Sequence, residues 1–275
     1  MGFCFNIYIM RVLIIGFGNM GQTYASSFTS SGFVNPTNIF VLNRSEVEKK
    51  KRFSIEKLNF YTEPTKSIFD VDIIILAVKP QDFSALANTI NPFVSKEHII
   101  LSVMAGISMQ SIQDKLGVDK VVRSMPNIPT QIGQGMTVFC ASSNIDRKDL
   151  FIVQNLINTT GKSIYVDKED MINAATAVSG SGPAYVYYFM NAMVQSAIEL
   201  GFSSSEAEFL VGQTFTGAVQ LQNRSKESHQ EWINKVSSKG GTTEAAIEIF
   251  NKFSLKNKIN DAMIAANYKA EELGK

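Results

Sequence analysis

Short apolar runs alternate with longer, helix-like segments through the first 167 residues. The run at 12–15 consists of valine, leucine and isoleucine, and a glycine follows it at once. Later runs are also bounded by Gly, Pro, Asn or other polar residues, and the expected strands are 12–15, 39–42, 73–78, 99–103, 121–123, 136–140 and 163–166. Helical segments between strands, such as 147–158, are typical of a parallel sheet with crossover helices.

After about residue 168 the strand-like runs disappear and helical signals dominate. Pro183 suits a first helical turn and Gly201 suits a helix end. Between them the chain is apolar on nearly every face, which requires burial against other helices or a second subunit. Further helices are expected at 204–222, 230–236, 243–250 and 255–270. The pattern predicts an α/β protein in which a parallel sheet precedes an all-α region.

Composition and charge exclude several classes of protein but do not identify the function. The 275 residues suffice for two domains, and the net charge of +1 includes no long basic stripe of the kind that binds nucleic acid; the short cluster at 49–52 indicates a solvated helix end. No apolar run reaches the roughly 18 residues of a membrane helix. Residues 1–9 lack the basic segment of a signal peptide. Cys4 and Cys140 have no metal-type spacing, so we expect no metal site and a cytoplasmic protein.

A glycine-rich motif directly follows the first expected strand and opens a helix. It reads Gly16, Phe17, Gly18, Asn19, Met20, Gly21. In a G-x-G-x-x-G motif the first glycine permits a tight turn, the second lets the backbone approach a pyrophosphate, and the third allows close helix–strand packing. The diphosphate then meets free N–H groups at the helix start. This context favours dinucleotide binding over a merely structural turn.

The end of the second expected strand indicates which dinucleotide binds. Asn43, Arg44 and Ser45 follow this strand, and no carboxylate precedes Glu46. An acidic residue there would accept hydrogen bonds from the ribose of NAD, whereas a guanidinium suits the 2′-phosphate of NADP. We therefore expect NADP(H), with NAD(H) as a possible second cofactor. The alternative is that Arg44 is an ordinary solvated residue at a helix start.

Two further strand ends should border the same crevice, because strand carboxyl ends face the ligand in such sheets. Ala77, Val78, Lys79 and Pro80 close one of these strands, although Pro80 equally suits simple helix punctuation. The segment 102–106, which contains Ala105, closes the next. We expect Ala77, Val78, Lys79, Pro80 and Ala105 to contact the cofactor.

Two Gly-rich helix starts lie in the second half. The turn at 179–183, Ser-Gly-Ser-Gly-Pro, is of a kind that commonly caps helices. Gly240, Gly241, Thr242 and Thr243 offer bare N–H groups and hydroxyls, which suit a carboxylate. The two histidines, His98 and His229, are expected to be bystanders. No nucleophile–base pair, paired carboxylates or metal-ligand cluster stands out, and this absence is consistent with hydride transfer from a nicotinamide.

From about Met10 to its C-terminus the chain resembles the Δ1-pyrroline-5-carboxylate reductase family. Five stretches carry the resemblance: IIGFGNMG at 14–21, AVKP at 77–80, MPNIP at 125–129, SGSGPAY at 179–185 and KGGTTEAAI at 239–247. It implies a Rossmann-type domain at 10–167 and a helical dimerisation and substrate domain at 168–275. It also implies a homodimer, in some members assembled into larger rings, that reduces 1-pyrroline-5-carboxylate to L-proline with NADPH or NADH in the last step of proline synthesis.

The resemblance also assigns roles to individual residues. Residues 16–21, 43–45 and 77–79 would hold the cofactor. Ser238 and residues 240–243 would hold the substrate carboxylate, and the catalytic Thr243 hydroxyl would lie near the ring nitrogen. The family often has Pro at the position of Lys239 and Thr at that of Ile128. Lys239 beside the carboxylate site could alter substrate affinity.

Two alternatives stay open. β-Hydroxyacid dehydrogenases share the overall plan but carry a lysine shortly after their Gly-x-Gly turn, where this chain has Val186. Reductase-like paralogues without a biosynthetic role, such as the competence-operon relatives, tend to lose the SGSGPA or GGTT residues. This chain keeps both motifs, which favours an active imine reductase.

Overall fold

The computed structural model describes residues 10–45 and 57–273. Residues 1–9 and the basic cluster at 49–52 lie outside these ranges. The chain forms two compact units. Unit 1 comprises residues 1–181 and 266–275, and unit 2 comprises residues 182–265. The domain ranges 10–167 and 168–275 stay a prediction.

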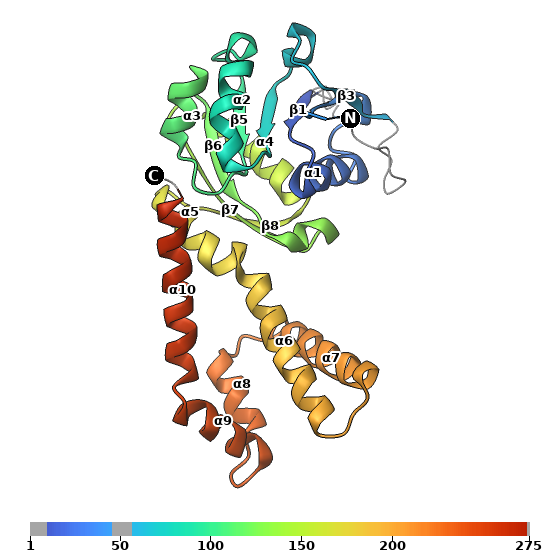
Figure 1. Cartoon of the computed structure of the whole chain (residues 1–275), viewed down its shortest axis with the longest axis vertical. Coiled ribbons are helices and arrows are strands. Elements are labelled where there is room, and N and C mark those ends of the chain that lie inside the picture. The colour runs from blue at the N-terminus through green and yellow to red at the C-terminus, as the bar shows by residue number, and fades with distance from the viewer. Residues whose placement is uncertain (1–9, 46–56, 274–275) are drawn as a thin grey trace, which may run out of the picture. The chain divides into compact units, whose positions relative to one another are not determined.

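An eight-stranded sheet forms the centre of unit 1, counted over the described residues. Its spatial order is β3-β2-β1-β4-β5-β6-β7-β8, and every neighbouring pair is parallel except β6 and β7. Figure 1 shows the sheet with the helices of this unit. The strands are β1 Val12–Ile15, β2 Ile39–Leu42, β3 Asn59–Tyr61, β4 Ile73–Leu76, β5 Ile99–Ser102, β6 Val121–Met125, β7 Gly135–Ala141 and β8 Gly161–Tyr165. The expected α/β class with a Rossmann-type sheet is confirmed.

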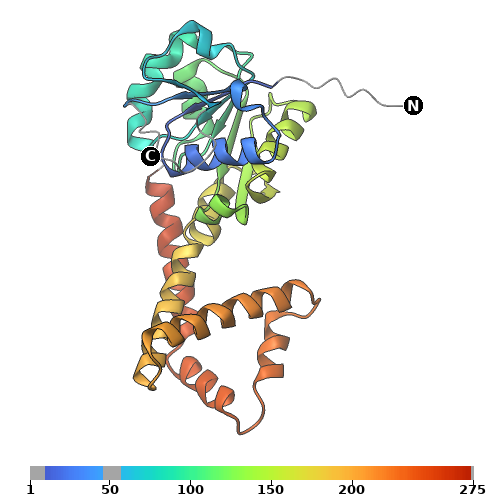
Figure 2. The same ribbon diagram turned by 90° about the vertical axis from the view of Figure 1, so that its right-hand side faces the viewer.

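Helices cover both faces of this sheet (Figure 2). The helices of unit 1 are α1 Asn19–Ser30, α2 Phe83–Ile90, α3 Met109–Leu116, α4 Arg147–Asn158 and α5 Asp170–Ala175. Residues of α1 and α4 pack with Val12 and Ile14 on one face, and residues of α2 and α3 pack with Leu13 and Ile15 on the other. Because both faces are covered, β1 and β4 are apolar along their whole length rather than alternating.

Two elements of unit 1 differ from the pattern expected from sequence. Strand β3 was not among the expected strands; it has three residues, all half-buried, so it carries no continuous apolar run. Helix α5 continues into a π-helical turn, Thr176–Gly180, in which the Ser181 N–H donates to the carbonyl of Thr176, five residues back, over 2.8 Å. The turn overlaps the SGSGP segment at Ser179 and Gly180.

Unit 2 is helical, as expected. Its helices are α6 Gly182–Glu199, α7 Ser204–Asn223, α8 His229–Val236, α9 Thr242–Lys252 and α10 Leu255–Glu272, the last of which ends in unit 1. Capping boxes start α7 and α8, and the hydrogen bonds from Ser203 and Ser228 lower the pKa of Glu206 and of Glu231, respectively.

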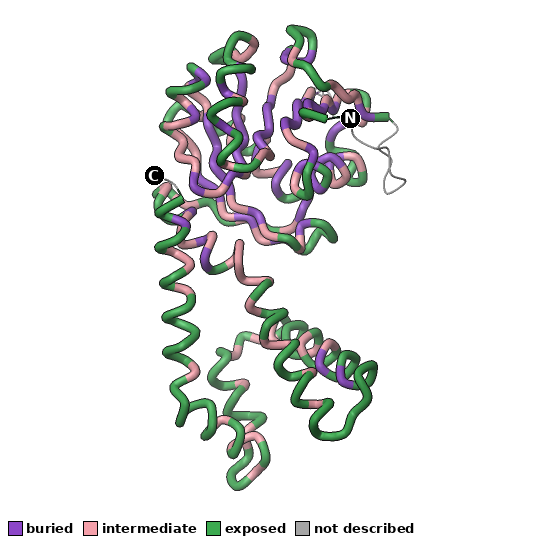
Figure 3. The backbone as a smooth tube through the Cα atoms, in the orientation of Figure 1, coloured by how far each residue is buried: buried purple, intermediate pink, exposed green. Residues whose placement is uncertain are grey.

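Most residues of unit 2 are exposed within one chain (Figure 3), and they include many large apolar side chains. Helix α6 has no buried residue, although its sequence is apolar on most faces. Tyr188 on α6, Phe209 on α7 and Phe250 on α9 are among the large exposed side chains. Exposed apolar surface on this scale is typical of interaction sites. No helix of the described residues is long and apolar enough to cross a membrane.

Candidate functional site

A cavity of about 560 Å³ opens at the carboxyl ends of β1, β2 and β4. The chain order reverses here: β2 and β3 extend the sheet from one side of β1, and β4 and its successors from the other. Ligands of open α/β sheets bind at such a switch point. The lining residues are 15–18, 42–45, 62–64 and 77–79 with Asp82, Ala85, Leu86, Thr89 and Ile90.

The glycine loop is fitted tightly to the neighbouring strand end. Gly16 has a φ of +93°, and a Cβ atom there would lie 2.7 Å from the carbonyl oxygen of Ala77, so only glycine fits. A Cβ on Gly21 would lie 2.1 Å from the Gly16 carbonyl oxygen. Gly18, in contrast, is the N-cap of α1 and faces open space. The loop therefore leaves the positive helix start accessible to a diphosphate.

Asn43 connects the glycine loop to the end of β2. Its Oδ1 accepts a hydrogen bond from the Phe17 N–H at 3.1 Å, and its Nδ2 donates to the Ser45 carbonyl at 2.8 Å. The carboxamide therefore connects the glycine loop to the turn that follows β2. Arg44 and Ser45 are exposed at the cavity, and Arg44 makes no ion pair with any residue that the structure describes.

The cavity brings together part of the expected cofactor residues: Gly16, Phe17, Gly18, Asn43, Arg44, Ser45, Ala77, Val78 and Lys79. The other expected positions do not line it. Asn19, Met20 and Gly21 form the first turn of α1. Pro80 begins a 3₁₀ turn, Pro80–Asp82, and Ala105 lies in the turn after β5.

Sequence reasoning missed two segments of the lining, residues 62–64 and positions 82–90. The first follows β3, which has too few apolar residues to be recognised as a strand. The second contributes Asp82 and four positions of α2, where the alternation of small and apolar residues indicates only an amphipathic helix. Pro64 was the available local signal, because proline often marks a turn after a strand.

The expected substrate residues form a tight turn in unit 2. The Gly241 N–H donates to the Ser238 carbonyl at 2.9 Å, and Gly240 has a φ of +72°. The Gly240 N–H donates to Oε2 of Glu244 at 2.6 Å, so a carboxylate already sits on this turn. Thr242 and Thr243 occupy the first turn of α9, where backbone N–H groups lack intrahelical acceptors. Thr243 is half-buried and Thr242 is exposed.

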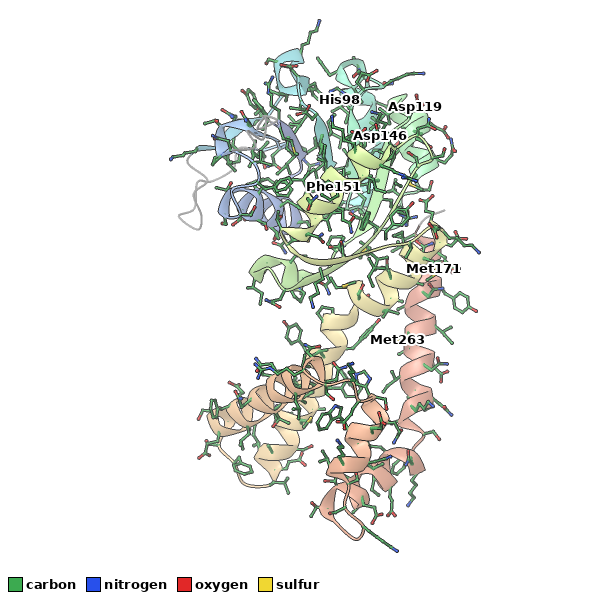
Figure 4. All side chains as sticks on the ribbon, turned by 180° about the vertical axis from the view of Figure 1, so that it is seen from behind. His98, Asp119, Asp146, Phe151, Met171 and Met263 are labelled. Atoms are coloured by element: carbon green, nitrogen blue, oxygen red, sulfur yellow. The ribbon has the colours of Figure 1, made fainter. Side chains whose placement is uncertain are left out.

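His98 has a structural environment. Figure 4 labels His98 within unit 1, where it is buried. Its Nε2 lies 2.8 Å from the Phe69 carbonyl oxygen, and its Nδ1 accepts from the Ser95 N–H at 2.9 Å. His229 begins α8. Among the described residues, no group of three or more His, Cys, Asp or Glu side chains could hold a metal ion.

Comparison with known proteins defines the class. Residues 11–106 match the family described as NADP oxidoreductase coenzyme F420-dependent, and residues 169–273 match the family described as pyrroline-5-carboxylate reductase dimerisation. A pyrroline-5-carboxylate reductase of Staphylococcus epidermidis is 31% identical over 267 residues, which cover 96% of this chain and 98% of the relative. The chain is thus an oxidoreductase with a nicotinamide-binding sheet and a dimerisation region.

Solved structures agree over nearly the full length. The pyrroline-5-carboxylate reductase of Coxiella burnetii has a TM-score of 0.88 at 30% identity and covers 97% of this chain and 99% of its own. The Plasmodium falciparum pyrroline carboxylate reductase with NADP bound has a TM-score of 0.86 at 28% identity, covering 97% and 98%. The chain belongs to the pyrroline-5-carboxylate reductase family, and it is an oxidoreductase that acts on a cyclic imine.

Proposed function

We propose that this protein reduces 1-pyrroline-5-carboxylate to L-proline with NADPH, as the last step of proline biosynthesis. The observation that carries the proposal is the cavity at the switch point of the sheet, where Arg44 and Ser45 lie beside an open glycine loop. A phosphorylated dinucleotide needs this combination of a bare helix start and a guanidinium.

The residues at the cavity fit the cofactor. Gly18 leaves room at the start of α1 for the diphosphate, Asn43 holds the loop in shape, and Arg44 would pair with the 2′-phosphate. Residues 77–79 border the cavity from β4. When bound, the reduced nicotinamide supplies a hydride to the imine carbon of the substrate. NADH lacks the 2′-phosphate, so we expect it to serve less well.

The turn at Ser238–Gly241 and the start of α9 would hold the substrate carboxylate. The Gly240 N–H donates to the Glu244 carboxylate, and a substrate carboxylate would replace that acceptor. The first-turn N–H groups of Thr242 and Thr243 and the positive end of α9 add further attraction. The Thr243 hydroxyl would hydrogen-bond the ring nitrogen, which takes up the proton that completes the reduction.

Oxidation of NADPH by the purified protein in the presence of pyrroline-5-carboxylate tests the proposal. We expect loss of the absorbance of reduced nicotinamide with matching formation of proline, and a slower reaction with NADH. A parallel arm with a β-hydroxyacid and NADP tests the dehydrogenase alternative. Folded protein that binds NADPH but neither oxidises it with pyrroline-5-carboxylate nor reduces NADP with the β-hydroxyacid would instead indicate a paralogue without this activity.

The family assignment and the exposed apolar faces of unit 2 support a homodimer. Assembly of dimers into a larger ring is part of the proposal, and light scattering during size-exclusion chromatography would measure it. We also propose a cytoplasmic location, which the buried free thiol of Cys140 fits.

A further inference from the structure

Two motifs, MPNIP at 125–129 and SGSGP at 179–183, line neither the cofactor cavity nor the glycine–threonine turn. They meet each other within unit 1. The Asn127 Nδ2 donates to the carbonyl oxygen of Ser179 at 3.1 Å, and its Oδ1 accepts from the Met136 N–H at 2.9 Å. A single carboxamide therefore joins its own loop to the start of β7, nine residues away, and to Ser179, 52 residues away.

The Asn127 side chain does not cap the helix at whose start it lies. It is the N-cap residue of a 3₁₀ helix, Ile128–Ile132, yet its side chain makes no capping hydrogen bond there. Asparagine at such a position ordinarily accepts from the N–H groups of its own helix. The backbone carbonyl of Asn127 accepts a hydrogen bond from the Thr130 hydroxyl at 2.8 Å, which stabilises the loop. The carboxamide can therefore bond Ser179 and Met136 rather than its own helix.

The anchor of this contact, at the start of β7, is rigid. A Cβ atom on Gly135 would lie 2.2 Å from Cγ2 of Thr130, and one on Gly161 would lie 2.2 Å from the Gly135 carbonyl oxygen. The strands β7 and β8 thus approach at van der Waals distance beside Met136. Its N–H is a fixed point that orients the Asn127 carboxamide.

The target of the contact is a carbonyl that the helix itself cannot satisfy. An α-helical continuation would pair the Ser179 carbonyl with the N–H four residues later, and that residue is Pro183, which has none. The chain passes this point through the π-helical turn Thr176–Gly180. Such turns are rare and frequently lie at functional sites. The Asn127 Nδ2 supplies the donor that Pro183 lacks.

We propose that Asn127 is a positioning residue of the reductase. It holds the π-helical turn in the conformation from which the chain enters α6, the helix that begins the unit containing residues 238–243. The inference rests on the proposed function. It does not involve the cofactor cavity, which β1, β2 and β4 form.

Asn127→Asp is the principal test. The variant keeps an acceptor for the Met136 N–H but turns a carboxylate oxygen toward the Ser179 carbonyl. We expect kcat with pyrroline-5-carboxylate to fall by about tenfold or more, because a half-buried carbonyl loses its donor and faces a negative charge. The Kd for NADPH should stay within about twofold of the native value, since the cavity is untouched. Amide hydrogen exchange should accelerate at 176–181.

The pH dependence separates this role from general weakening of the fold. Protonation of the introduced carboxyl at lower pH returns one O–H donor, so the activity of Asn127→Asp relative to the native protein should rise as the pH falls from about 6 toward about 4. Asn127→Ala, which cannot regain a donor, should show a flat ratio. Asn155→Asp is the matched control, because the Asn155 Nδ2 also donates to a backbone carbonyl, that of Phe151 at 2.7 Å, on the exposed face of α4.

The outcomes are distinct. Native protein that reduces the substrate, with both Asn127 variants at native kcat, would overturn the positioning role alone. The positioning role would also be overturned if kcat per folded molecule is unchanged and only thermal stability falls. It would likewise be overturned if the ratio of variant to native activity is independent of pH for both variants. Native protein that is inactive with pyrroline-5-carboxylate would remove the proposed function, and the positioning role with it.

Discussion

Arg123 on β6 donates from Nη1 to Oε1 of Glu169 at 2.8 Å, while its Nη2 donates to Oδ1 of Asn173 at 2.9 Å. Arg123 is 3% exposed. The same Glu169 oxygen accepts from the Met109 N–H at the start of α3. The carboxylate therefore connects a central strand, a covering helix and the segment that leads into α5. It is also the main compensation for a buried positive charge.

Glu169→Gln should destabilise the protein. The amide keeps the shape and one acceptor but removes the charge, which leaves the guanidinium uncompensated. A polar cavity of about 490 Å³ borders the pair, so water can reach it. We therefore expect a loss of about 2 kcal/mol in the free energy of unfolding and a lower Tm by about 4–8 °C, below the range for fully dry pairs.

Chemical denaturation and thermal unfolding would measure this effect. Lys96→Ala is the matched control, because the Lys96–Asp119 pair spans 3.8 Å and both side chains are largely exposed. It should change the free energy of unfolding by less than about 0.5 kcal/mol. Equal midpoints for native protein and Glu169→Gln would show that the buried pair is not stabilising.

The sequence predicted the elements that depend on local pattern. The apolar run before Gly16 and the motif that follows gave the first strand, the turn and the cavity edge, because both the run and the required glycines are local. Strand β3 was missed because its three residues are stabilised by pairing with β2 rather than by apolar burial. Residues 62–64 of the cavity lining, which follow β3, were missed for the same reason.

Contacts between distant segments could not be predicted. Asn127 and Ser179 are 52 residues apart, and Arg123 and Glu169 are 46 apart, so no spacing rule relates them. Only Pro183 carried a local signal, since a proline four residues after Ser179 leaves that carbonyl without its helical donor. The hydrogen bonds of the Asn43 carboxamide with Phe17 and Ser45 could not be predicted from the sequence either. Because the carboxamide is already hydrogen-bonded, it is less available to the cofactor.

Arg44→Ala should reduce the use of NADPH more than that of NADH. Because the Asn43 carboxamide is hydrogen-bonded to Phe17 and Ser45, contact with the 2′-phosphate falls mainly to the Arg44 guanidinium. Loss of a charge-assisted bond should raise the KM for NADPH by about tenfold or more and that for NADH by less than about twofold. Steady-state kinetics with both cofactors would measure the ratio.

Arg147→Ala provides the control for that experiment. Arg147 is an exposed arginine at the start of α4, outside the cavity lining, and its removal alters net charge by the same amount. Its preference ratio should match the native one. If Arg44→Ala also leaves the ratio unchanged, Arg44 does not bind the 2′-phosphate.

Thr243→Ala should lower turnover without weakening NADPH binding. The hydroxyl lies in the first turn of α9 in unit 2, whereas the cofactor cavity lies in unit 1. Loss of one hydrogen bond to the ring nitrogen should lower kcat by about 10- to 100-fold. Kinetics and fluorescence titration with NADPH would separate the two effects. Thr29→Ala, which removes a hydroxyl bonded within α1, is the control. Parallel losses of kcat and NADPH affinity would contradict the role of Thr243.

Cys140 should make stability fall at alkaline pH. Burial, together with the nearby Glu169 carboxylate, raises the pKa of the Cys140 thiol to about 12. The folded protein therefore keeps this thiol neutral, while the unfolded chain ionises it near pH 8.5. A raised thiol pKa contributes stability below the unfolded value, and that contribution is lost as pH rises from about 8.5 toward 12.

The comparison with Cys140→Ala isolates this effect, because Cys4 and every other alkaline group are common to both proteins. Between about pH 8 and pH 10 the native protein should lose about 1–2 kcal/mol of unfolding free energy relative to the variant, at 1.36 kcal/mol per pH unit above the unfolded pKa. Urea unfolding at both pH values, under a reducing agent, would measure it. A difference between the two proteins that does not change with pH would mean that the folded thiol ionises as readily as the unfolded one.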